Sequence, residues 1–284
     1  MTVYLSKFLL PGIHREESFF DNLQRTCYTN FYPFGVFPPK ELDRLSFEPI
    51  TIFYGSNGSG KTTLLNVIAE TIGAERNTPF NRSSFFGDFT DRCQPVWDSF
   101  YQDSTVITSD DVFDYIFDLR ALNEGVDTKR DRLLDEYMEL KTSHFQLRSL
   151  ADYEHLKKVN SARRHTGSEF VRRNLPKNVP ERSNGESAFL YFTNKVEGNR
   201  IYLLDEPENS LSAEYQQELL CFIEDSARFY NCQFIIATHS PFILAAKYAK
   251  IYDLDSVPVT VKKWTELANV RRYFDFFMER RDEF

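Results

Sequence analysis

The stretch Gly55-Ser56-Asn57-Gly58-Ser59-Gly60-Lys61-Thr62 is the most informative part of this 284-residue sequence. An apolar run from Ile50 to Tyr54 precedes it, and apolar residues at helical spacing follow from Leu64 to Ile68. A strand, a glycine-rich turn and a helix start in this order are typical of a phosphate-binding loop, whose backbone N–H groups point at phosphate oxygens. The sequence therefore predicts a phosphate site at this turn.

Each residue type in the loop has a physical reason to be there. Glycines permit the tight turn and the close approach of backbone to phosphate. We expect the Lys61 ammonium to neutralise the β- and γ-phosphates of ATP and the Thr62 hydroxyl to bind Mg²⁺. The predicted ATP contacts are Gly55, Ser56, Asn57, Gly58, Ser59, Gly60, Lys61, Thr62 and Thr63. A plain glycine-rich turn before a helix is the less favoured alternative.

An acidic pair ends a second apolar strand, where Ile201 to Leu204 runs into Asp205 and Glu206. Ligands of open α/β sheets lie at the carboxyl ends of the strands, so both acids are expected to face the phosphate loop. Asp205 is predicted to bind Mg²⁺, and Glu206 to accept a proton from the attacking water. An isolated acidic pair is usually a solvated turn, but the loop at Lys61 favours catalysis.

A third strand, Phe234 to Ala237, leads into Thr238-His239-Ser240-Pro241. The His239 imidazole is predicted to hydrogen-bond a γ-phosphate oxygen or the catalytic water. The alternative is a strand-end histidine held by local polar groups. With Lys61 and Glu206, His239 completes the predicted catalytic set.

Four blocks occur in one order and together resemble the ABC ATPase superfamily, most closely its soluble, stand-alone ATPases related to the structural-maintenance-of-chromosomes group. They are Gly55–Thr62, Ser183–Glu186, Leu203–Glu208 and Thr238–Pro241. The resemblance implies that Ser183, Gly185 and Glu186 form a signature motif that caps ATP held by a second copy, in a head-to-tail homodimer. Ser183 and Glu186 also fit a capping box, so a plain helix cap stays open.

The resemblance implies two further contacts. Asn209 to Ser212 follows the acid pair as the family's D-loop does, which places Ser210 against the opposite subunit. The family also has a Mg²⁺-binding glutamine on a loop after the phosphate-loop helix. Gln94 is the first candidate and Gln102 the second, although the residues around Gln94 do not clearly match the family pattern.

Alternating strands and helices predict an α/β fold of the P-loop NTPase type, with a mostly parallel central sheet, an N-terminal antiparallel β portion and an inserted helical lobe. The expected division is an N-terminal half at 1–127, the lobe at 128–182 and a C-terminal half at 183–284. Residues 261–284 place Trp264, Leu267, Val270, Phe274 and Phe277 at helical spacing. We expect this stripe to pack on its own core, with a partner-helix surface as the alternative.

Charge is distributed unevenly along the chain. The formal net charge is −8, but residues 128–182 carry 13 Lys or Arg against 8 Asp or Glu, leaving 21 against 34 elsewhere. The lobe therefore has a net charge of +5 and the remainder −13. DNA or RNA could bind the lobe through Arg163, Arg164, Arg172 and Arg173. A solvated helical face or a protein-docking arm is at least as well supported, because acids are mixed among the bases.

The remaining composition narrows the class of protein. No apolar run reaches the roughly 18 residues of a membrane span, so no membrane association is expected. The four cysteines are scattered, which favours reduced thiols and a cytoplasmic protein over a disulfide framework.

Three functions fit these features. The first is an ATPase that dimerises around ATP and Mg²⁺ as a conformational switch for a partner protein or nucleic acid. The second is an ATP-dependent scaffold or sensor with slow turnover in an antiphage defence or toxin complex. The third, a transporter subunit, is disfavoured because Glu186 and Ser187 replace the glycine and glutamine of the longer transporter motif.

Overall fold

The computed structural model describes residues 1–23, 27–143, 152–175, 177–180 and 182–283. They form two compact units. The sheet unit contains Met1–Phe113 and Asn184–Phe284, and the helical unit contains Asp114–Ser183. Helix α4 (Ser109–Thr142) begins in the first and continues into the second. The helical residues thus begin earlier than the 128–182 range that charge and composition indicated.

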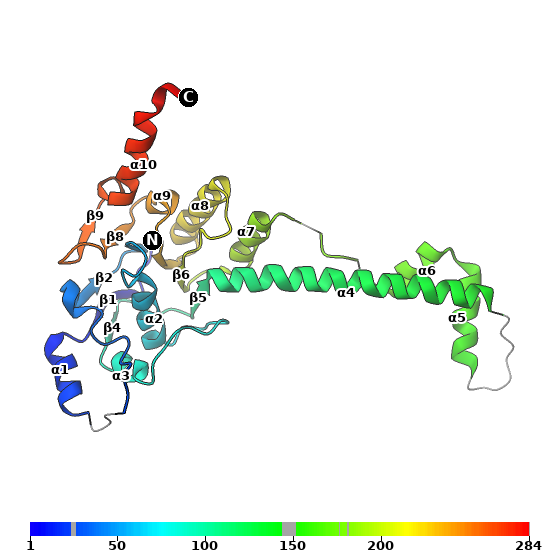
Figure 1. Ribbon diagram of the computed structural model, residues 1–284, viewed down its shortest axis with the longest axis horizontal. Helices are drawn as coiled ribbons and strands as arrows, with labels where there is room; N and C mark the ends of the chain where they lie inside the picture. Colours follow the sequence, from blue (N-terminus) through cyan, green and yellow to red (C-terminus); the bar gives the residue numbers. More distant parts are fainter. Residues whose placement is uncertain (24–26, 144–151, 176, 181, 284) are drawn as a thin grey trace. The chain divides into compact units, whose positions relative to one another are not determined.

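A six-stranded sheet is the centre of the sheet unit in the described part of the chain (Figure 1). Its spatial order is β5 (Ser104–Thr108), β6 (Ile201–Asp205), β7 (Gln233–Ala237), β3 (Ile50–Tyr54), β8 (Lys250–Asp253) and β9 (Thr260–Lys262). The first five strands are parallel, and β9 pairs antiparallel with β8. All five residues of β3 and of β7 are buried, as expected for parallel strands covered on both faces.

A second, antiparallel sheet forms the N-terminal β portion. Strand β1 (Leu5–Leu9) lies between β2 (Arg44–Ser46) and β4 (Gln94–Trp97). Phe8 and Leu45 of this sheet share one apolar core with Phe53 of β3 and Leu64 of α2 (Lys61–Ile72). The predicted α/β class, the mostly parallel sheet and the antiparallel portion are confirmed.

The other described α-helices of the sheet unit have 4 to 17 residues. They are α1 (Ile13–Asp21), α3 (Phe86–Thr90), α7 (Asn184–Lys195), α8 (Ala213–Phe229), α9 (Pro241–Leu244) and α10 (Ala268–Glu279), with 3₁₀ turns η1 (Pro38–Lys40), η3 (Trp264–Glu266) and η4 (Arg281–Glu283). Across the residues placed in the structure, every helix is too short or too polar to cross a membrane.

The helical unit confirms the inserted helical lobe. It contains most of α4, then α5 (Tyr153–Arg164) and α6 (Gly167–Asn174). Its small core consists of Tyr137, Leu140, Val159, Ala162 and Phe170. Helix α6 starts with a capping box, in which Thr166 and Glu169 satisfy each other's backbone N–H groups.

The C-terminal stripe divides into a buried and an exposed part. Leu267 and Val270 are buried, as the packing interpretation expects. Phe274 and Phe277 are about half exposed, and α10 continues beyond the rest of the sheet unit towards the C-terminus (Figure 1). Trp264, the first residue of the stripe, is also exposed, so only its middle part, Leu267 and Val270, is buried.

Candidate functional site

The loop from Gly55 to Gly60 connects β3 to α2 with a backbone that requires glycine. Gly58 and Gly60 have φ values of 82° and 91°, in the left-handed region that L side chains avoid. A Cβ on Gly55 would lie 2.4 Å from Ser59 Oγ, so any side chain there would displace the loop. Helix α2 begins at Lys61, which leaves its first N–H groups facing the loop. An anion is favoured at this helix start.

The Lys61 side chain lies across this loop. It is 5% exposed, and its Nζ donates to the carbonyl oxygens of Gly55 at 2.8 Å and Ser56 at 3.2 Å. Ser56 also donates from its backbone N and its Oγ to the two carboxylate oxygens of Asp255, at 2.8 and 2.9 Å. Sequence reasoning missed Asp255, because it lies 199 residues from Ser56 and has no motif around it.

Thr62 and Asp205 meet at the carboxyl end of the sheet. The Thr62 Oγ1 donates to Asp205 Oδ1 at 3.0 Å. Burial, together with the charge of Glu206, raises the pKa of Asp205 to about 6, against the opposing effect of the Thr62 hydrogen bond. A hydroxyl and a carboxylate oxygen this close are ligand types that Mg²⁺ prefers, and a cation would offset the cost of the buried charge. The two residues fit the predicted metal site.

Strand order explains how the three motifs reach one edge. Strand β7, which leads to His239, lies between the phosphate-loop strand β3 and the acid strand β6. Asp205 pairs in register with Ala237, and the backbone N of Glu206 donates to Ala237 O at 2.8 Å. His239 follows Ala237 by two residues, so its ring lies beside the acids.

Glu206 has an unusual backbone at the end of β6. Its φ is 46°, in the left-handed region, which costs a non-glycine residue about 1–2 kcal/mol. Its Oε2 accepts a hydrogen bond from Asn209 Nδ2 at 3.1 Å, and its Oε1 lies 3.6 Å from His239 Nδ1. Contacts of the Glu206 side chain and backbone N thus hold the residue in this strained backbone conformation. Residues held in such conformations cluster at functional sites.

Thr63 and Ser59 complete the loop's surroundings. The Tyr32 hydroxyl donates to Thr63 Oγ1 at 2.9 Å, and burial raises the pKa of Tyr32. Ser59 Oγ is buried without a hydrogen-bond partner among the described residues, whereas Asn57 is exposed at the tip of the loop. Sequence reasoning missed Tyr32 as a neighbour of the loop, because it lies 31 residues before Thr63.

The predicted signature residues lie at the start of α7. This helix begins at Asn184, so Gly185 and Glu186 are in its first turn and Ser183 directly precedes it. A Cβ on Gly185 would come within 3.1 Å of the Tyr215 ring and 3.5 Å of Ser210 O. Ser210 itself has a φ of 77°. The signature glycine and the predicted D-loop are therefore close neighbours in the sheet unit.

The two candidate glutamines lie elsewhere in the sheet unit. Gln94 is an exposed residue of β4, paired with Leu9 in the antiparallel sheet. It lines a surface pocket with residues that include Leu9 and His14. Gln102 is exposed, and its backbone N donates to Asn199 O at 3.2 Å. Neither side chain is placed at Thr62 or Asp205 by a described contact, and the glutamine ligand stays a prediction.

The four arginines of the basic lobe are exposed on two helices. Arg163 and Arg164 end α5, and Arg172 and Arg173 lie in the last turn of α6. Arg163 Nη2 donates to the backbone oxygen of Ser143 at 2.7 Å. The helical unit therefore presents cationic side chains to solvent, which is what an electrostatic contact with a polyanion requires.

Comparison with known families finds a match in the second half of the chain. A family described as "AAA domain, putative AbiEii toxin, Type IV TA system" matches residues 188–245. That range contains the acid pair at 205–206 and the His239 turn. The match confirms the resemblance at the level of a P-loop ATPase domain. No curated protein matches the sequence.

Solved structures resemble the chain only distantly. "An inward-facing conformation of a putative metal-chelate type ABC transporter" has 16% identity and a TM-score of 0.39, covering 80% of this chain and 77% of that one. The "SMC head domain from Thermotoga maritima" has 14% identity and a TM-score of 0.38, with coverages of 88% and 94%. The Smc head domain from Pyrococcus furiosus has 14% identity and a TM-score of 0.34, with coverages of 84% and 95%. Similarity at this level assigns no function to this chain.

Proposed function

Since this chain carries an AAA-type P-loop ATPase domain, we propose that it binds ATP with Mg²⁺ at the sheet edge and hydrolyses it to ADP and phosphate. The observation that carries this proposal is the 3.0 Å contact between Thr62 and Asp205, with Glu206 and His239 beside it. One strand end thus supplies a metal ligand and a base, and the glycine loop supplies the phosphate site.

The chemistry divides among the residues by type. Lys61 and the backbone N–H groups of the loop hold the β- and γ-phosphates. Thr62 and Asp205 would hold Mg²⁺, which would neutralise charge on the phosphate oxygens. Glu206 takes a proton from water as the water oxygen bonds to the γ-phosphorus and the bond to the ADP oxygen breaks. His239 donates a hydrogen bond to the γ-phosphate.

The second part of the proposal is a head-to-tail homodimer that closes around two ATP molecules. Gly185 packs against Tyr215 and the backbone of Ser210, so the predicted signature and D-loop form one small surface. Helix α7 starts at this surface, and Ser183, Gly185 and Glu186 would bind the γ-phosphate of the partner's ATP. ATP that touches both copies binds the closed state more tightly, which is how a ligand shifts a conformational equilibrium.

The ATP cycle would act as a switch for a partner protein or nucleic acid. The exposed arginines of α5 and α6 support a polyanion as one such partner. The alternative is an ATP-held scaffold or sensor of an antiphage or toxin complex, in which turnover is slow. The description of the matched family, which includes a toxin–antitoxin system, favours keeping this second candidate.

A single substitution tests hydrolysis and assembly together. Glu206→Gln should retain ATP and lower phosphate release by about 10²–10⁴-fold, the usual contribution of a general base. Trapped ATP should then increase the dimer fraction in size-exclusion chromatography with light scattering. Glu218→Gln, at an exposed position of α8, is the matched control and should behave as wild type. If wild type and Glu206→Gln release phosphate equally, and neither changes size with ATP, the switch function is refuted. The scaffold or sensor function is then the remaining candidate.

A further inference from the structure

Glu208 is a buried carboxylate that the mechanism above does not use. It follows the acid pair by two residues, and its side chain is 5% exposed. A buried carboxylate is costly unless it is hydrogen-bonded or paired. Its partners therefore indicate why a charge is kept at this position.

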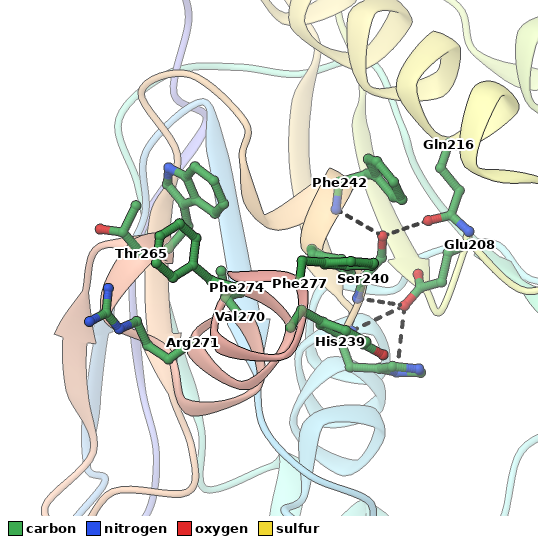
Figure 2. Close-up of a pocket in the computed structure, with 13 residues that line it drawn as sticks. Glu208, Gln216, His239, Ser240, Phe242, Thr265, Val270, Arg271, Phe274 and Phe277 are labelled. Atoms are coloured by element: carbon green, nitrogen blue, oxygen red, sulfur yellow. Dashed lines mark hydrogen bonds and ion pairs between the residues drawn. The ribbon is translucent and has the colours of Figure 1, made fainter. Parts of the chain in front are cut away.

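One oxygen of Glu208 binds the whole turn that carries His239. Its Oε1 accepts hydrogen bonds from Thr238 Oγ1 at 2.6 Å, from the backbone N of His239 at 3.1 Å and from the backbone N of Ser240 at 3.2 Å. Figure 2 shows the contacts from His239 and Ser240 converging on Glu208. An ionised carboxylate only accepts hydrogen bonds, and hydrogen bonds to a charged acceptor are stronger than those between neutral groups.

The same turn is fixed from its other side by α8. Ser240 Oγ donates to Gln216 Oε1 at 2.6 Å. It also accepts hydrogen bonds from the backbone N of Phe242 and of Ile243, which caps the start of α9. Thr238 is fully buried. The backbone on both sides of His239 is therefore held, and only the imidazole projects from it.

The imidazole itself lies between two carboxylates. His239 Nδ1 is 3.5 Å from Glu208 Oε1 and 3.6 Å from Glu206 Oε1. Within the described residues, neither His239 Nδ1 nor Glu208 Oε2 has a hydrogen-bond partner, although both are buried. The ring is 45% exposed, so its other nitrogen can reach a ligand. An acid beside Nδ1 selects the ring orientation that presents Nε2, as in other oriented histidines.

We propose that Glu208 is the positioning residue of this site, which holds the 238–240 turn and orients His239 so that Nε2 faces the γ-phosphate. The inference rests on the proposed ATP hydrolysis and deepens it. Glu208 touches neither ATP nor water in this role and acts through His239. Glu206 stays the base, and the two acids, two residues apart, have separate tasks.

Two substitutions separate the charge of Glu208 from its shape. Glu208→Gln is isosteric and keeps an acceptor for the turn, but it removes the charge and adds N–H donors. Glu208→Asp keeps the charge and draws the acceptor back by about 1.5 Å, one carbon–carbon bond. Glu218→Gln is again the control, since it removes an exposed acid from α8. Circular dichroism and thermal melting of each variant show that it is folded.

The experiment places these variants in the wild-type and in the His239→Ala background. ATP affinity is measured with a fluorescent ATP analogue and turnover by phosphate release. In the wild-type background, Glu208→Gln should leave the Kd for ATP within about twofold and lower kcat by about 10–100-fold, the effect of a misplaced catalytic group. In the His239→Ala background, Glu208→Gln should lower kcat no further, because residues that act as a unit are not additive.

Several results would overturn the inference. The first is an unchanged kcat in Glu208→Gln, and the second is an equal loss of kcat in the wild-type and His239→Ala backgrounds. The third is a loss of ATP affinity as large as the loss of turnover. Each of these alone is sufficient. If Glu208→Gln does not fold, the same criteria apply to Glu208→Asp. If the wild type hydrolyses ATP and Glu206→Gln abolishes hydrolysis while Glu208→Gln does not reduce it, the proposed function stands and only the inference about Glu208 is refuted. Wild-type protein that releases no phosphate removes both.

Discussion

The sheet unit and the helical unit use their polar residues in opposite ways. In the sheet unit, β3 and β7 are wholly buried, and the polar side chains of the site gather where β3, β6 and β7 end. In the helical unit, a five-residue apolar cluster holds the helices together, and charged residues cover their exposed faces. Buried parallel strands force polar groups to their ends, whereas amphipathic helices spread them along a face.

The largest expected difference concerns the two cores. Phe234 of β7 is fully buried and stacks on Tyr202, with ring centroids 5.6 Å apart, so Phe234→Ala should destabilise the sheet unit by about 3–5 kcal/mol and reduce ATP binding. Phe170→Ala should loosen α5 and α6 but leave ATP binding unchanged, because Phe170 belongs to the separate cluster with Tyr137. Hydrogen exchange and nucleotide titration measure both effects. Loss of ATP binding in Phe170→Ala would show that the units are not independent.

A smaller, pH-dependent effect distinguishes two aspartates. The pKa of Asp205 is raised to about 6 by burial, so its stabilising contribution to the nucleotide-free protein is full below about pH 4 and is lost as the pH rises through 6. Asp205→Asn should therefore increase the melting temperature at pH 8, by an amount equivalent to about 1–3 kcal/mol, and lose this advantage near pH 4. Mg²⁺-dependent ATP binding by the wild type should weaken below pH 6, because a protonated carboxyl is a poor ligand.

Asp127 in the helical unit provides the contrast. Hydrogen bonds from Asn178 and Arg130 lower the pKa of Asp127. Its contribution to folding stability is therefore present above the pKa of the unfolded chain and is lost as the pH falls through the lowered pKa of the folded protein. Asp127→Asn should thus not raise the melting temperature at pH 8. Thermal melting of both variants between pH 4 and pH 8 makes the comparison. A gain at pH 8 for both would mean that burial of Asp205 is not the cause.

The smallest expected effect concerns the basic helices. Replacing Arg163, Arg164, Arg172 and Arg173 by Ala should leave ATP hydrolysis unchanged. If nucleic acid binds the helical unit, these changes should weaken binding and reduce the slope of log affinity against log salt, since fewer counterions are released. Fluorescence anisotropy with a labelled duplex at several salt concentrations measures both quantities. An affinity that does not change would assign these arginines to a solvated face or a protein contact.

Local sequence determined the phosphate loop and the elements around it. The strand Ile50–Tyr54 and a helix directly after the loop are found as predicted, because a buried strand, obligatory glycines and a helix start are all set by neighbouring residues. The strands before Asp205 and Thr238 were predictable for the same reason. The proposed roles of Lys61, Thr62, Asp205 and Glu206 follow from their residue types and from their places in these motifs.

Tertiary structure alone decided the contacts between these segments. The position of β7 between β3 and β6 brings His239 beside Glu206, and no local pattern contains a strand order. The hydrogen bonds of Glu208 reach a turn 30 residues away, and Asp255 meets Ser56 across 199 residues. The C-terminal stripe has one periodicity but two environments, since Val270 is buried and Phe277 is about half exposed. Periodicity reports which face of an element is apolar, and only packing determines whether another element covers that face.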